Sequence, residues 1–429
     1  MKNIFKKIIY KILELEARVV LWKYKPKIVA VTGNVGKTST KDAIYTVLSN
    51  KLFVRKSQKS FNSDIGVPLA ILGCPNAWNN PFLWFKNILF GLEIILIGNK
   101  FPKWLVLEVG ADRPGDIKNI ASWLNPDIVV VTRFSAVPVH IELFKYRKEL
   151  IKEKKYLAKS LKKDGILILN YDDVDVINFK KDTSGRIITF GFNNGADIFG
   201  SNSTILYEKD RPVGMNFKIN IAGNSAPISI FGVLGLQHIY PTLSAVAVGI
   251  SKNINMVDIS QSFVGYIPPK GRMNIIEGKN DSIIIDDTYN SSPIALHEAL
   301  LVCKEIKISG RKIICVGDMM ELGKFAIEEH KKAGEEISTI ADILVVVGVR
   351  AQYIKEGALK AGMKAENIFS FDDSRSAGDY LSNIISKNDL ILAKGSQSVR
   401  MERVVEKIMA KPEQKAELLV RQEEEWAKR

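Results

Sequence analysis

Short runs of apolar and β-branched residues alternate with segments of helical periodicity along most of the chain. The runs KIVAVTG (27–33), WLVLEVG (104–110), DIVVVTR (127–133) and GILILN (165–170) are typical of strands buried on both faces of a parallel sheet. From about residue 190 to 235 the pattern changes, because IITFGF, MNFKINI and PISIFGV alternate apolar and polar positions with turn residues between them. The pattern predicts a parallel sheet with an antiparallel excursion.

A second alternation of strands and helices follows GYIPPKGR at 265–272. Its strand candidates are SIIIDDTYN (282–290), KIICVGDM (312–319), DILVVVG (342–348), NIFSFDD (367–373) and DLILAKGS (389–396). The Pro-Pro-Lys-Gly-Arg turn is the best candidate for a domain boundary, because proline and glycine interrupt regular structure. The expected fold class is α/β, with a central parallel-sheet domain over residues 27–272 and a Rossmann-like α/β domain over residues 273–410.

Residues 1–26 are expected to form a basic amphipathic helix. Ile8, Ile12, Leu15 and Val19 recur at helical spacing among lysines and an arginine. We expect this helix to pack on the first domain with a solvated basic face. Reversible contact with an anionic membrane is the alternative interpretation.

Two further segments stand apart in composition. PFLWFKNILFGLEIILIG (81–98) is strongly apolar, but Lys86 and Glu93 interrupt it, and it falls short of the ~20 apolar residues that a membrane-spanning helix needs. We expect a core or interface helix there. Residues 411–429 are polar and charged, and we expect them to form a solvated helical tail.

The bulk composition narrows the class of protein. At 429 residues and 46% hydrophobic, the chain is long enough for two or three domains with apolar cores. The three cysteines, Cys74, Cys303 and Cys315, lack metal-ligand spacing and fit a reducing, cytoplasmic compartment. The net charge of +14 suits anionic small molecules, and since no nucleic-acid motif accompanies it, we expect no nucleic-acid partner.

The stretch VTGNVGKTS, residues 31–39, is a candidate phosphate-binding loop. The usual pattern G-x-x-x-x-G-K-[ST] would put a glycine five positions before Gly36, but a valine stands there and the early glycine is Gly33. A predicted strand precedes the loop and a predicted helix follows it, so backbone N–H groups can cradle an anion. Lys37 would neutralise phosphate charge, and Thr38 would offer a hydroxyl to Mg²⁺.

Acidic and imidazole side chains follow several of the other predicted strands. Glu108, His140 and the pair Asp286 and Asp287 all fall at or beyond a strand end, the edge where parallel α/β sheets bind ligands. Glu108 is either a metal ligand or a helix-capping partner. The aspartate pair could hold a ribose or a metal, or cap a turn. A single histidine is more often structural than a ligand.

Seven segments together resemble the Mur ligases, the ATP-dependent amide ligases of peptidoglycan synthesis. They occur in family order and are TGNVGKTS (32–39), FNSDIGVPLAIL (61–72), LEVGADRPGDI (107–117), VHIELF (139–144), DDTYNSSP (286–293), VGDMMELG (316–323) and AKGSQSVRMERVV (393–405). Within that family, the segments are most similar to those of the members that join D-alanyl-D-alanine to a UDP-N-acetylmuramoyl-tripeptide.

The resemblance implies roles for particular side chains. Catalysis would rest on Lys37, His140 and a carbamylated Lys154, which lies fourteen positions after the histidine with Lys152 and Lys155 close by. ATP would contact Gly33, Asn34, Val35, Gly36, Lys37, Thr38, Ser39, Arg272, Asp287 and Tyr289. Two Mg²⁺ ions would be held by Thr38, Glu108, His140 and Lys154. Substrates would contact Asn62, Ser63, Asn290 and Lys394.

The implied reaction has two steps and two organic substrates. A carboxylate of the UDP-muramoyl peptide, or of a related acceptor, would attack the γ-phosphate of ATP to form an acyl phosphate. D-alanyl-D-alanine, or another amine, would then attack the acyl carbon and release phosphate. Closure of the C-terminal domain would bring the two substrates together.

The sequence departs from the family pattern in three places. Only 26 residues precede Lys27, fewer than the family's UDP-sugar-binding domain needs. His238 and Pro241 stand where the family has asparagines, and Arg133 replaces another asparagine. These departures leave other hypotheses open: a ligase for a lipid-linked acceptor, folylpolyglutamate synthase-like chemistry, or a phosphate-loop protein that only binds ATP and partners.

Overall fold

The structure, a computed structural model, describes residues 2–58, 61–98, 100–134, 144 and 146–427. Over these residues the first 231 positions contribute a nine-stranded sheet in the order β2-β3-β1-β4-β5-β6-β7-β8-β9. Its strands are β1 (Lys27–Thr32), β2 (Val54–Lys56), β3 (Trp104–Glu108), β4 (Ile128–Val131), β5 (Ile166–Asn170), β6 (Arg186–Gly191), β7 (Ile198–Glu208), β8 (Arg211–Ile221) and β9 (Asn224–Phe231). The expected parallel sheet with an antiparallel excursion is confirmed.

The excursion begins later than the sequence pattern indicated. IITFGF was assigned to the antiparallel part, but most of it lies in β6, which pairs in parallel with β5. The antiparallel pairs are β7 with β8 and β8 with β9. Strand β6 also pairs in parallel with β7, and its last four residues are buried, so its one polar residue there, Thr189, did not mark a solvent-facing side.

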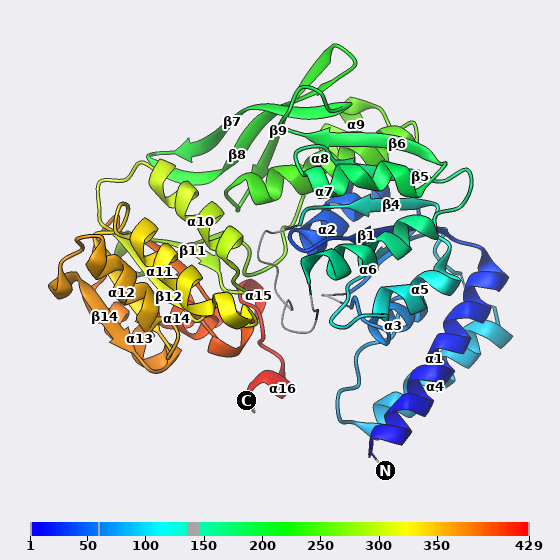
Figure 1. The fold of residues 1–429 in the computed structure, drawn as a ribbon, viewed down its shortest axis with the longest axis horizontal. Coiled ribbons are helices and arrows are strands. Elements are labelled where there is room, and N and C mark those ends of the chain that lie inside the picture. The colour runs from blue at the N-terminus through cyan, green and yellow to red at the C-terminus, as the bar shows by residue number, and fades with distance from the viewer. Residues whose placement is uncertain (1, 59–60, 99, 135–143, 145, 428–429) are drawn as a thin grey trace.

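A second sheet, six-stranded over the described residues, has the order β10-β11-β15-β12-β13-β14. Its strands are β10 (Asn274–Glu277), β11 (Ile283–Asp287), β12 (Lys312–Gly317), β13 (Ile343–Val347), β14 (Ile368–Phe371) and β15 (Leu390–Lys394). All neighbours pair in parallel except β10 with β11. Figure 1 shows the two sheets side by side, each flanked by helices.

Helices cover both faces of each sheet, as the near-continuous apolar character of the parallel strands requires. The helices are α2 (Lys37–Ser49), α3 (Gly66–Leu72), α5 (Asp116–Leu124), α6 (Arg147–Lys159), α7 (Val174–Ile177), α8 (Leu236–Ser251) and α9 (Met256–Ser262) around the first sheet, and α10 (Pro293–Glu305), α11 (Ala326–Ile337), α12 (Gln352–Lys360), α13 (Ser374–Ile384) and α14 (Glu402–Ile408) around the second. One apolar cluster runs from α2 and α8 through to α10 and α11, so the two domains share a continuous core.

Helix α1 (Lys2–Tyr24) forms as expected but buries a different face. The predicted apolar stripe points outward, since Ile8, Ile12 and Leu15 are exposed. The buried positions are Ile9, Leu13, Ala17 and Val20. Both stripes have helical spacing, and the sequence alone gave no means of telling which one meets the domain.

The apolar segment after residue 80 forms α4 (Pro81–Leu96), which is not a core helix. Its buried residues are Trp84, Asn87, Gly91 and Ile94, and the side chains on the other face are exposed. Helix α4 packs along α1, where the rings of Tyr10 and Trp84 lie 6.1 Å apart and Tyr24 donates a hydrogen bond to Ile94 O. Among the described residues, no helix is both long enough and apolar enough to cross a membrane.

The charged tail is not a single solvated helix. Two short helices, α15 (Lys415–Leu418) and α16 (Glu424–Ala427), lie along it, and Leu419 and Arg421 are buried. The Arg421 guanidinium donates hydrogen bonds to Glu402 on α14 and to the carbonyls of Thr288 and Tyr289. The tail is therefore fastened beneath the end of β11.

Glu16 provides a test of how α1 packs on α4. Its carboxylate is buried against Gly91, has no hydrogen-bond partner among the described residues, and has its pKa raised to about 7 by burial. Folding raises this pKa from the usual 4.5 to about 7, so the protonated carboxyl stabilises the folded state. This contribution is complete below pH 4.5 and is lost as the pH rises through about 7. We expect Glu16→Gln to raise the free energy of unfolding by ~1–3 kcal/mol at pH 8 and much less at pH 5.

Urea unfolding at the two pH values measures this effect. Glu14→Gln is the control, because Glu14 is partly exposed on the same helix and pairs with Lys11 and Arg18. Exposed pairs contribute ~0–1 kcal/mol, so this control should change stability little at either pH. An equal effect of Glu16→Gln at both pH values would contradict the assignment.

Candidate functional site

The loop between β1 and α2 lies at the carboxyl edge of the first sheet, held by the neighbouring strand β4. A Cβ on Gly33 would lie 1.9 Å from Thr132 Oγ1, so no side chain fits there. The loop is fastened by hydrogen bonds from Asn34 N to Arg133 O at 2.8 Å and from Thr132 Oγ1 to Val35 O at 2.7 Å. Gly36 follows with φ 81°, a left-handed conformation, and α2 begins at the next residue.

The first residues of α2 face a buried carboxylate at the end of β3. Thr38 Oγ1 donates to Glu108 Oε2 at 2.9 Å, and Asn62 Nδ2 donates to Glu108 Oε1 at 2.9 Å. Lys37 Nζ donates to Asn34 O at 3.2 Å. Desolvation lowers the pKa of Lys37, while the negative charges of Glu108 and Asp112 oppose that shift. A β- or γ-phosphate at the start of α2 would meet this lysine together with the helix N-terminus.

Helix α6 places one lysine beneath this loop. Lys154 is buried, and burial together with the nearby cation of Lys37 lowers its pKa to about 7. Of its neighbours, Lys152 is exposed and Lys155 pairs with Asp182 at 2.7 Å. Lys154 is therefore the buried lysine of the three, and its lowered pKa gives it a neutral population near pH 7 beside the loop.

The opposite side of the site comes from the second sheet. Lys394, buried at the end of β15, pairs with Asp287 Oδ2 at 2.5 Å and donates to Asn290 O at 2.9 Å. Asp286, one position earlier on β11, accepts a hydrogen bond from Thr288 Oγ1 at 2.6 Å. Burial raises the pKa of Asp286 to about 6. Asp286 stabilises the turn after β11 through its bond to Thr288, whereas Asp287 lines the cleft.

Arg272 joins the two sides. Its guanidinium lies 4.2 Å from the ring centroid of Tyr289, and its Nη2 donates to Thr38 Oγ1 at 3.3 Å. His238 Nε2 donates to Arg272 O at 2.7 Å. Burial lowers the pKa of His238 to about 4, so the ring is neutral at pH 7 and its role in the structure is to fix the Arg272 backbone.

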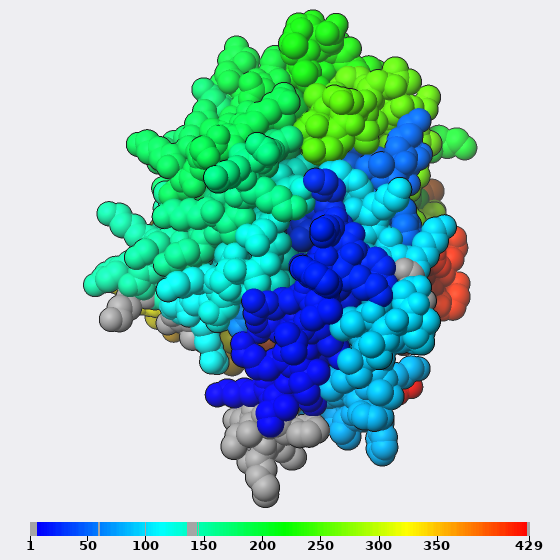
Figure 2. All heavy atoms as spheres, turned by 90° about the vertical axis from the view of Figure 1, so that its right-hand side faces the viewer, coloured from blue at the N-terminus to red at the C-terminus, as the bar shows by residue number. Residues whose placement is uncertain are grey.

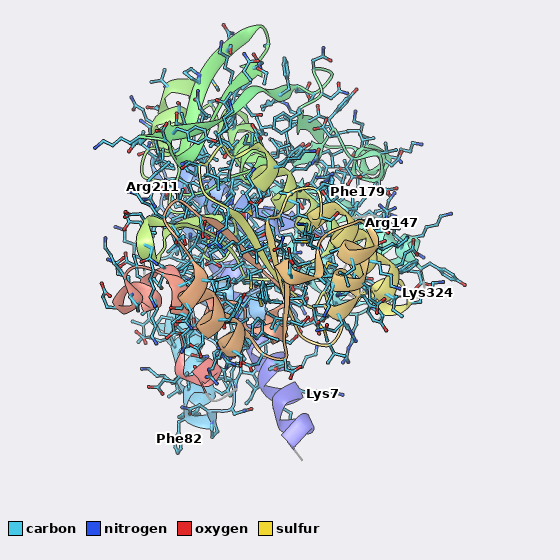
Figure 3. The ribbon with its side chains drawn as sticks, turned by 90° about the vertical axis from the view of Figure 1, so that its left-hand side faces the viewer. Lys7, Phe82, Arg147, Phe179, Arg211 and Lys324 are labelled. Carbon is cyan, nitrogen blue, oxygen red and sulfur yellow. The ribbon has the colours of Figure 1, made fainter. Side chains whose placement is uncertain are left out.

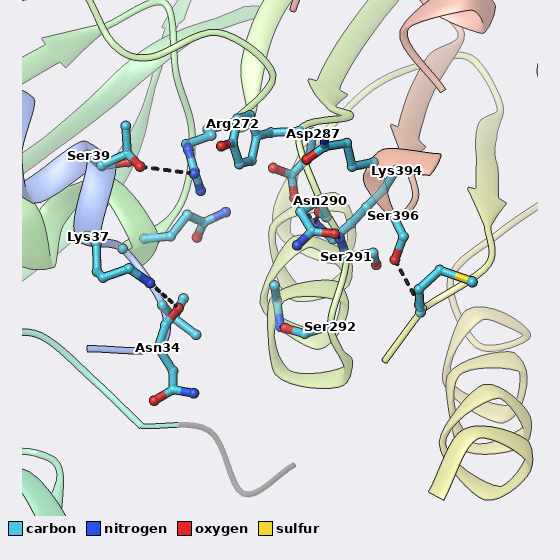
Figure 4. A pocket seen from close by; sticks show the side chains of 18 of the residues that line it. Asn34, Lys37, Ser39, Arg272, Asp287, Asn290, Ser291, Ser292, Lys394 and Ser396 are labelled. Carbon is cyan, nitrogen blue, oxygen red and sulfur yellow. Dashed lines mark hydrogen bonds and ion pairs between the residues drawn. The ribbon is translucent and has the colours of Figure 1, made fainter. Parts of the chain in front are cut away.

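Most of these groups line a cleft of about 780 Å³ between the two domains, whereas Lys154 and Asp286 lie behind its lining. Figure 4 shows Lys37 and Asn34 on one side of this cleft and Asn290, Lys394 and Ser396 on the other. Two contacts bridge its ends: Arg133 pairs with Glu298 on α10, and the ring of Trp426 meets that of Trp78 edge-on with centroids 6.3 Å apart. The cleft has room for a nucleotide and part of a second molecule.

Most of the residues singled out from the sequence converge on this cleft. Its lining includes Asn34, Val35, Gly36, Lys37, Thr38, Ser39, Asn62, Glu108, Arg272, Asp287, Tyr289, Asn290 and Lys394. Ser63 does not line it; its hydroxyl accepts a hydrogen bond from Gly66 N at the start of α3. Gly33 does not line the cleft either; it allows the close approach of the loop to Thr132. His140 lies outside the described residues, as does its neighbour Glu142.

The cleft also contains residues to which the sequence analysis gave no role. They include Asp112, Gln237, Glu298, Met320, Ser396, Arg400 and Trp426. Asp112 and Ser396 lie within segments already singled out, and their position just after a strand could have assigned them to the site. Trp426 had none, because it belongs to a charged tail whose fold-back depends on the buried Arg421–Glu402 pair.

Comparison with known proteins identifies relatives of both domains. Residues 90–249 match the Mur ligase middle domain, and residues 271–397 match the Mur ligase glutamate ligase domain. The chain is 28% identical over 401 residues to the UDP-N-acetylmuramoyl-tripeptide–D-alanyl-D-alanine ligase of Bacillus subtilis (strain 168), covering 93% of this chain and 79% of the relative.

Two solved structures share the fold over most of their length. One is the MurF ligase of Thermotoga maritima in complex with ADP, with a TM-score of 0.74, 25% identity, and coverage of 93% of this chain and 83% of that one. The other is MurF from Acinetobacter baumannii, with a TM-score of 0.75, 23% identity, and coverage of 92% and 79%.

The tight passage at Gly33 predicts a selective loss of nucleotide binding. In Gly33→Ala the new Cβ would collide with Thr132 and displace the loop, so we expect ATP affinity to fall about tenfold or more, ~1.4 kcal/mol of binding free energy. Calorimetric titration with ATP measures this. Gly223→Ala is the control: Gly223 also has positive φ, 81°, but no atom lies within 4 Å of its Cβ position.

That control should lose ~1–2 kcal/mol of stability from its backbone conformation and keep its ATP affinity. Unchanged ATP binding by Gly33→Ala would show that the loop does not hold the nucleotide.

Proposed function

This chain belongs to the Mur ligase family, and on that premise we propose that it joins D-alanyl-D-alanine to a UDP-N-acetylmuramoyl-tripeptide at the expense of ATP. Relatives that match 93% and 89% of this chain carry that name. The observation that carries the proposal is the cleft itself, in which a phosphate-binding loop from one domain faces Asp287, Asn290 and Lys394 of the other. Because ATP supplies the phosphoryl group, we place the reaction in the cytoplasm.

In the first step the loop holds the triphosphate. Backbone N–H groups of residues 36–38, at the start of α2, face the phosphates, and Lys37 neutralises charge that develops on the transferred group. Arg272, which reaches Thr38 and stacks on Tyr289, supplies a second cation from the domain junction. The acceptor carboxylate attacks the γ-phosphorus, the bond to the β–γ bridging oxygen breaks, and ADP leaves with an acyl phosphate formed.

The donor set at the end of β3 fits Mg²⁺. Thr38 Oγ1 and the Glu108 carboxylate are oxygen ligands 2.9 Å apart, and Mg²⁺ commonly binds one or two protein oxygens together with phosphates and water. Over the described residues no cluster of three His, Cys, Asp or Glu side chains forms a complete metal cage. Thr38 and Glu108 would hold the ion, together with His140 and Lys154, and it would offset phosphate charge.

Lys154 fits the carbamylated lysine that the family resemblance implies. A neutral amine can attack CO₂, forming an N–C bond and releasing one proton to solvent, whereas an ammonium cannot. Burial keeps a neutral population of Lys154 near pH 7. The resulting anion would lie close to the cation of Lys37 and would replace a buried positive charge by a negative one.

In the second step the amine of the donor attacks the acyl carbon, a tetrahedral intermediate collapses, and phosphate leaves. The two domains contribute opposite walls of the cleft, so the reacting groups meet only when both walls are in place. We propose that Asn62 and Ser63 lie on the acceptor side and that Asn290 and Lys394 orient the substrates from the second domain. Lys394 is held in place by Asp287 and the Asn290 carbonyl.

A substrate screen tests the proposed reaction directly. We expect ADP release only when ATP, a UDP-muramoyl tripeptide and D-alanyl-D-alanine are all present, with one ADP formed per amide. Single amino acids should not replace the dipeptide. ADP release with a folate or a lipid-linked acceptor, and none with the muramoyl tripeptide, would exclude the proposed acceptor while leaving the ligase chemistry intact.

Substitution of the two lysines tests the catalytic roles. Lys37→Ala and Lys154→Ala should each lower kcat about 100-fold or more, because each removes a charge-stabilising group from the phosphoryl step. Lys152→Ala, an exposed neighbour, should be unaffected. Added bicarbonate should raise the wild-type rate most below pH 7, where less of Lys154 is neutral, and should not affect Lys154→Ala. Wild-type rates for Lys154→Ala would exclude the carbamate.

A further inference from the structure

Helices α1 and α4 carry two long apolar stripes that no element among the described residues covers. On α4 the exposed side chains are Phe82, Phe85, Leu89, Leu92 and Leu96, spaced three and four residues apart on one face. On α1 they are Ile8, Ile12, Leu15 and Trp22, also on one face. The exposed fractions are 82% for Phe82, 77% for Leu96 and 77% for Trp22. Soluble surfaces seldom leave so many large apolar side chains together.

The two helices run side by side in the same direction. Tyr10 meets Trp84 near their starts, Glu16 meets Gly91 in the middle, and Tyr24 reaches Ile94 near their ends. Figure 2 shows them adjacent on one face of the molecule, with α1 in dark blue. At 1.5 Å per residue they form a ridge of about 24–35 Å.

Positive charge borders these stripes. The basic side chains are Lys7, Lys11, Arg18, Lys23 and Lys25 along α1 and just after it, and Lys86 on α4. The acidic side chains on the two helices are Glu14, which pairs with Lys11 and Arg18, the buried Glu16, and Glu93. Figure 3 shows Phe82 and Lys7 pointing outward at the same end of the molecule.

We propose that the outer faces of α1 and α4 form a docking surface for an anionic membrane. Large apolar and aromatic side chains flanked by lysines are the features of helices that lie in the bilayer interface. The phenyl and leucyl groups would enter the acyl boundary while the lysine stems extend to the headgroups. Because neither helix can cross the bilayer, the attachment is peripheral. This inference does not depend on the substrates of the cleft.

Charge argues for a lipid surface over a second copy of the chain. In a twofold dimer the same surface meets itself, so the lysines of α1 and α4 would face their own copies. An anionic bilayer instead offers the opposite charge over the whole ridge. Helix α4 has only 16 residues, which is shorter than the three to four heptads of a sustained coiled coil.

The docking surface also leaves the catalytic cleft accessible. In Figure 1, α1 and α4 lie along the right-hand side of the first domain, while the second sheet lies on the left. The start of α4 comes near the tail of the chain, where Trp78 contacts Trp426. A chain bound through the outer faces of the two helices would therefore keep the second sheet away from the lipid.

Vesicle sedimentation of the full chain tests the proposal. We expect the wild type to pellet with phosphatidylglycerol/phosphatidylcholine vesicles at low salt, and much less with pure phosphatidylcholine or at high salt. The triple variant Phe82→Ser/Phe85→Ser/Leu96→Ser should lower partitioning about tenfold or more. The charge variant Lys7→Glu/Lys86→Glu should weaken binding only to the anionic vesicles.

The matched control is Ile267→Ser/Val349→Ser, which removes two equally exposed apolar side chains elsewhere, 84% and 83% exposed. This control should bind vesicles like the wild type, and all variants should keep the wild-type unfolding midpoint and ATP turnover in solution. The proposal is overturned if the wild type stays in the supernatant with anionic vesicles, or if the triple variant pellets equally well. A concentration-dependent dimer that the triple variant abolishes, without vesicle binding, would assign the surface to a second copy.

Discussion

The nucleotide side of the cleft depends on the close approach of the chain at residue 33 to Thr132. No atom beyond Cα fits at Gly33, and the Thr132 hydroxyl that occupies the space donates to Val35 O. This contact holds the loop against the end of β4, while register pairing of Val31 with Glu108 brings the end of β3 to its other side. The order of strands thus places a carboxylate, a hydroxyl and a lysine around the N-terminus of α2 without any flexible segment between them.

The second domain completes the site through groups that are themselves fixed. Lys394 has its ammonium group bound by Asp287 and by a backbone carbonyl, so its position is determined before any ligand arrives. Arg272, at the junction, is held by its stack on Tyr289 and by the neutral His238 beneath it. His238, which stands where the family pattern has an asparagine, therefore supports a cation that lines the cleft.

Much of the fold and of the cleft could be predicted because the relevant signals are local. Buried parallel strands read as apolar runs, and the glycine, lysine and threonine of the loop follow one of them directly. The order of the strands depends on contacts between distant segments and was not predicted. The direction in which β6 pairs depends on such contacts too, and the antiparallel prediction for it was wrong. The predicted orientation of α1 was wrong for another reason: Ile8 and Ile9 begin two stripes of equal spacing, and packing against α3 and α4 decides between them.

Lys154 shows the same division between local and distant information. The family spacing falls on Lys154 with Lys152 and Lys155 close by, and burial separates Lys154 from the other two. Trp426 could not be anticipated at all, because the contacts that turn the tail back toward the cleft join distant parts of the chain: Arg421 binds Glu402 and the carbonyls of Thr288 and Tyr289.

The tail, folded back in this way, connects the two domains and limits how far they can separate. Arg421 is anchored in the second domain, and five residues later Trp426 rests on Trp78 of the first. Five residues of extended chain reach about 18 Å at most, and less while the last turn stays helical. As long as the two indoles remain in contact, the cleft can widen only by the slack between Arg421 and Trp426, and the hydrogen bond from Arg400 Nη1 to Trp426 O at 2.9 Å restrains that slack. Wider opening of the cleft requires the two tryptophans to separate first. The tail therefore sets the distance beyond which domain opening costs the free energy of this contact.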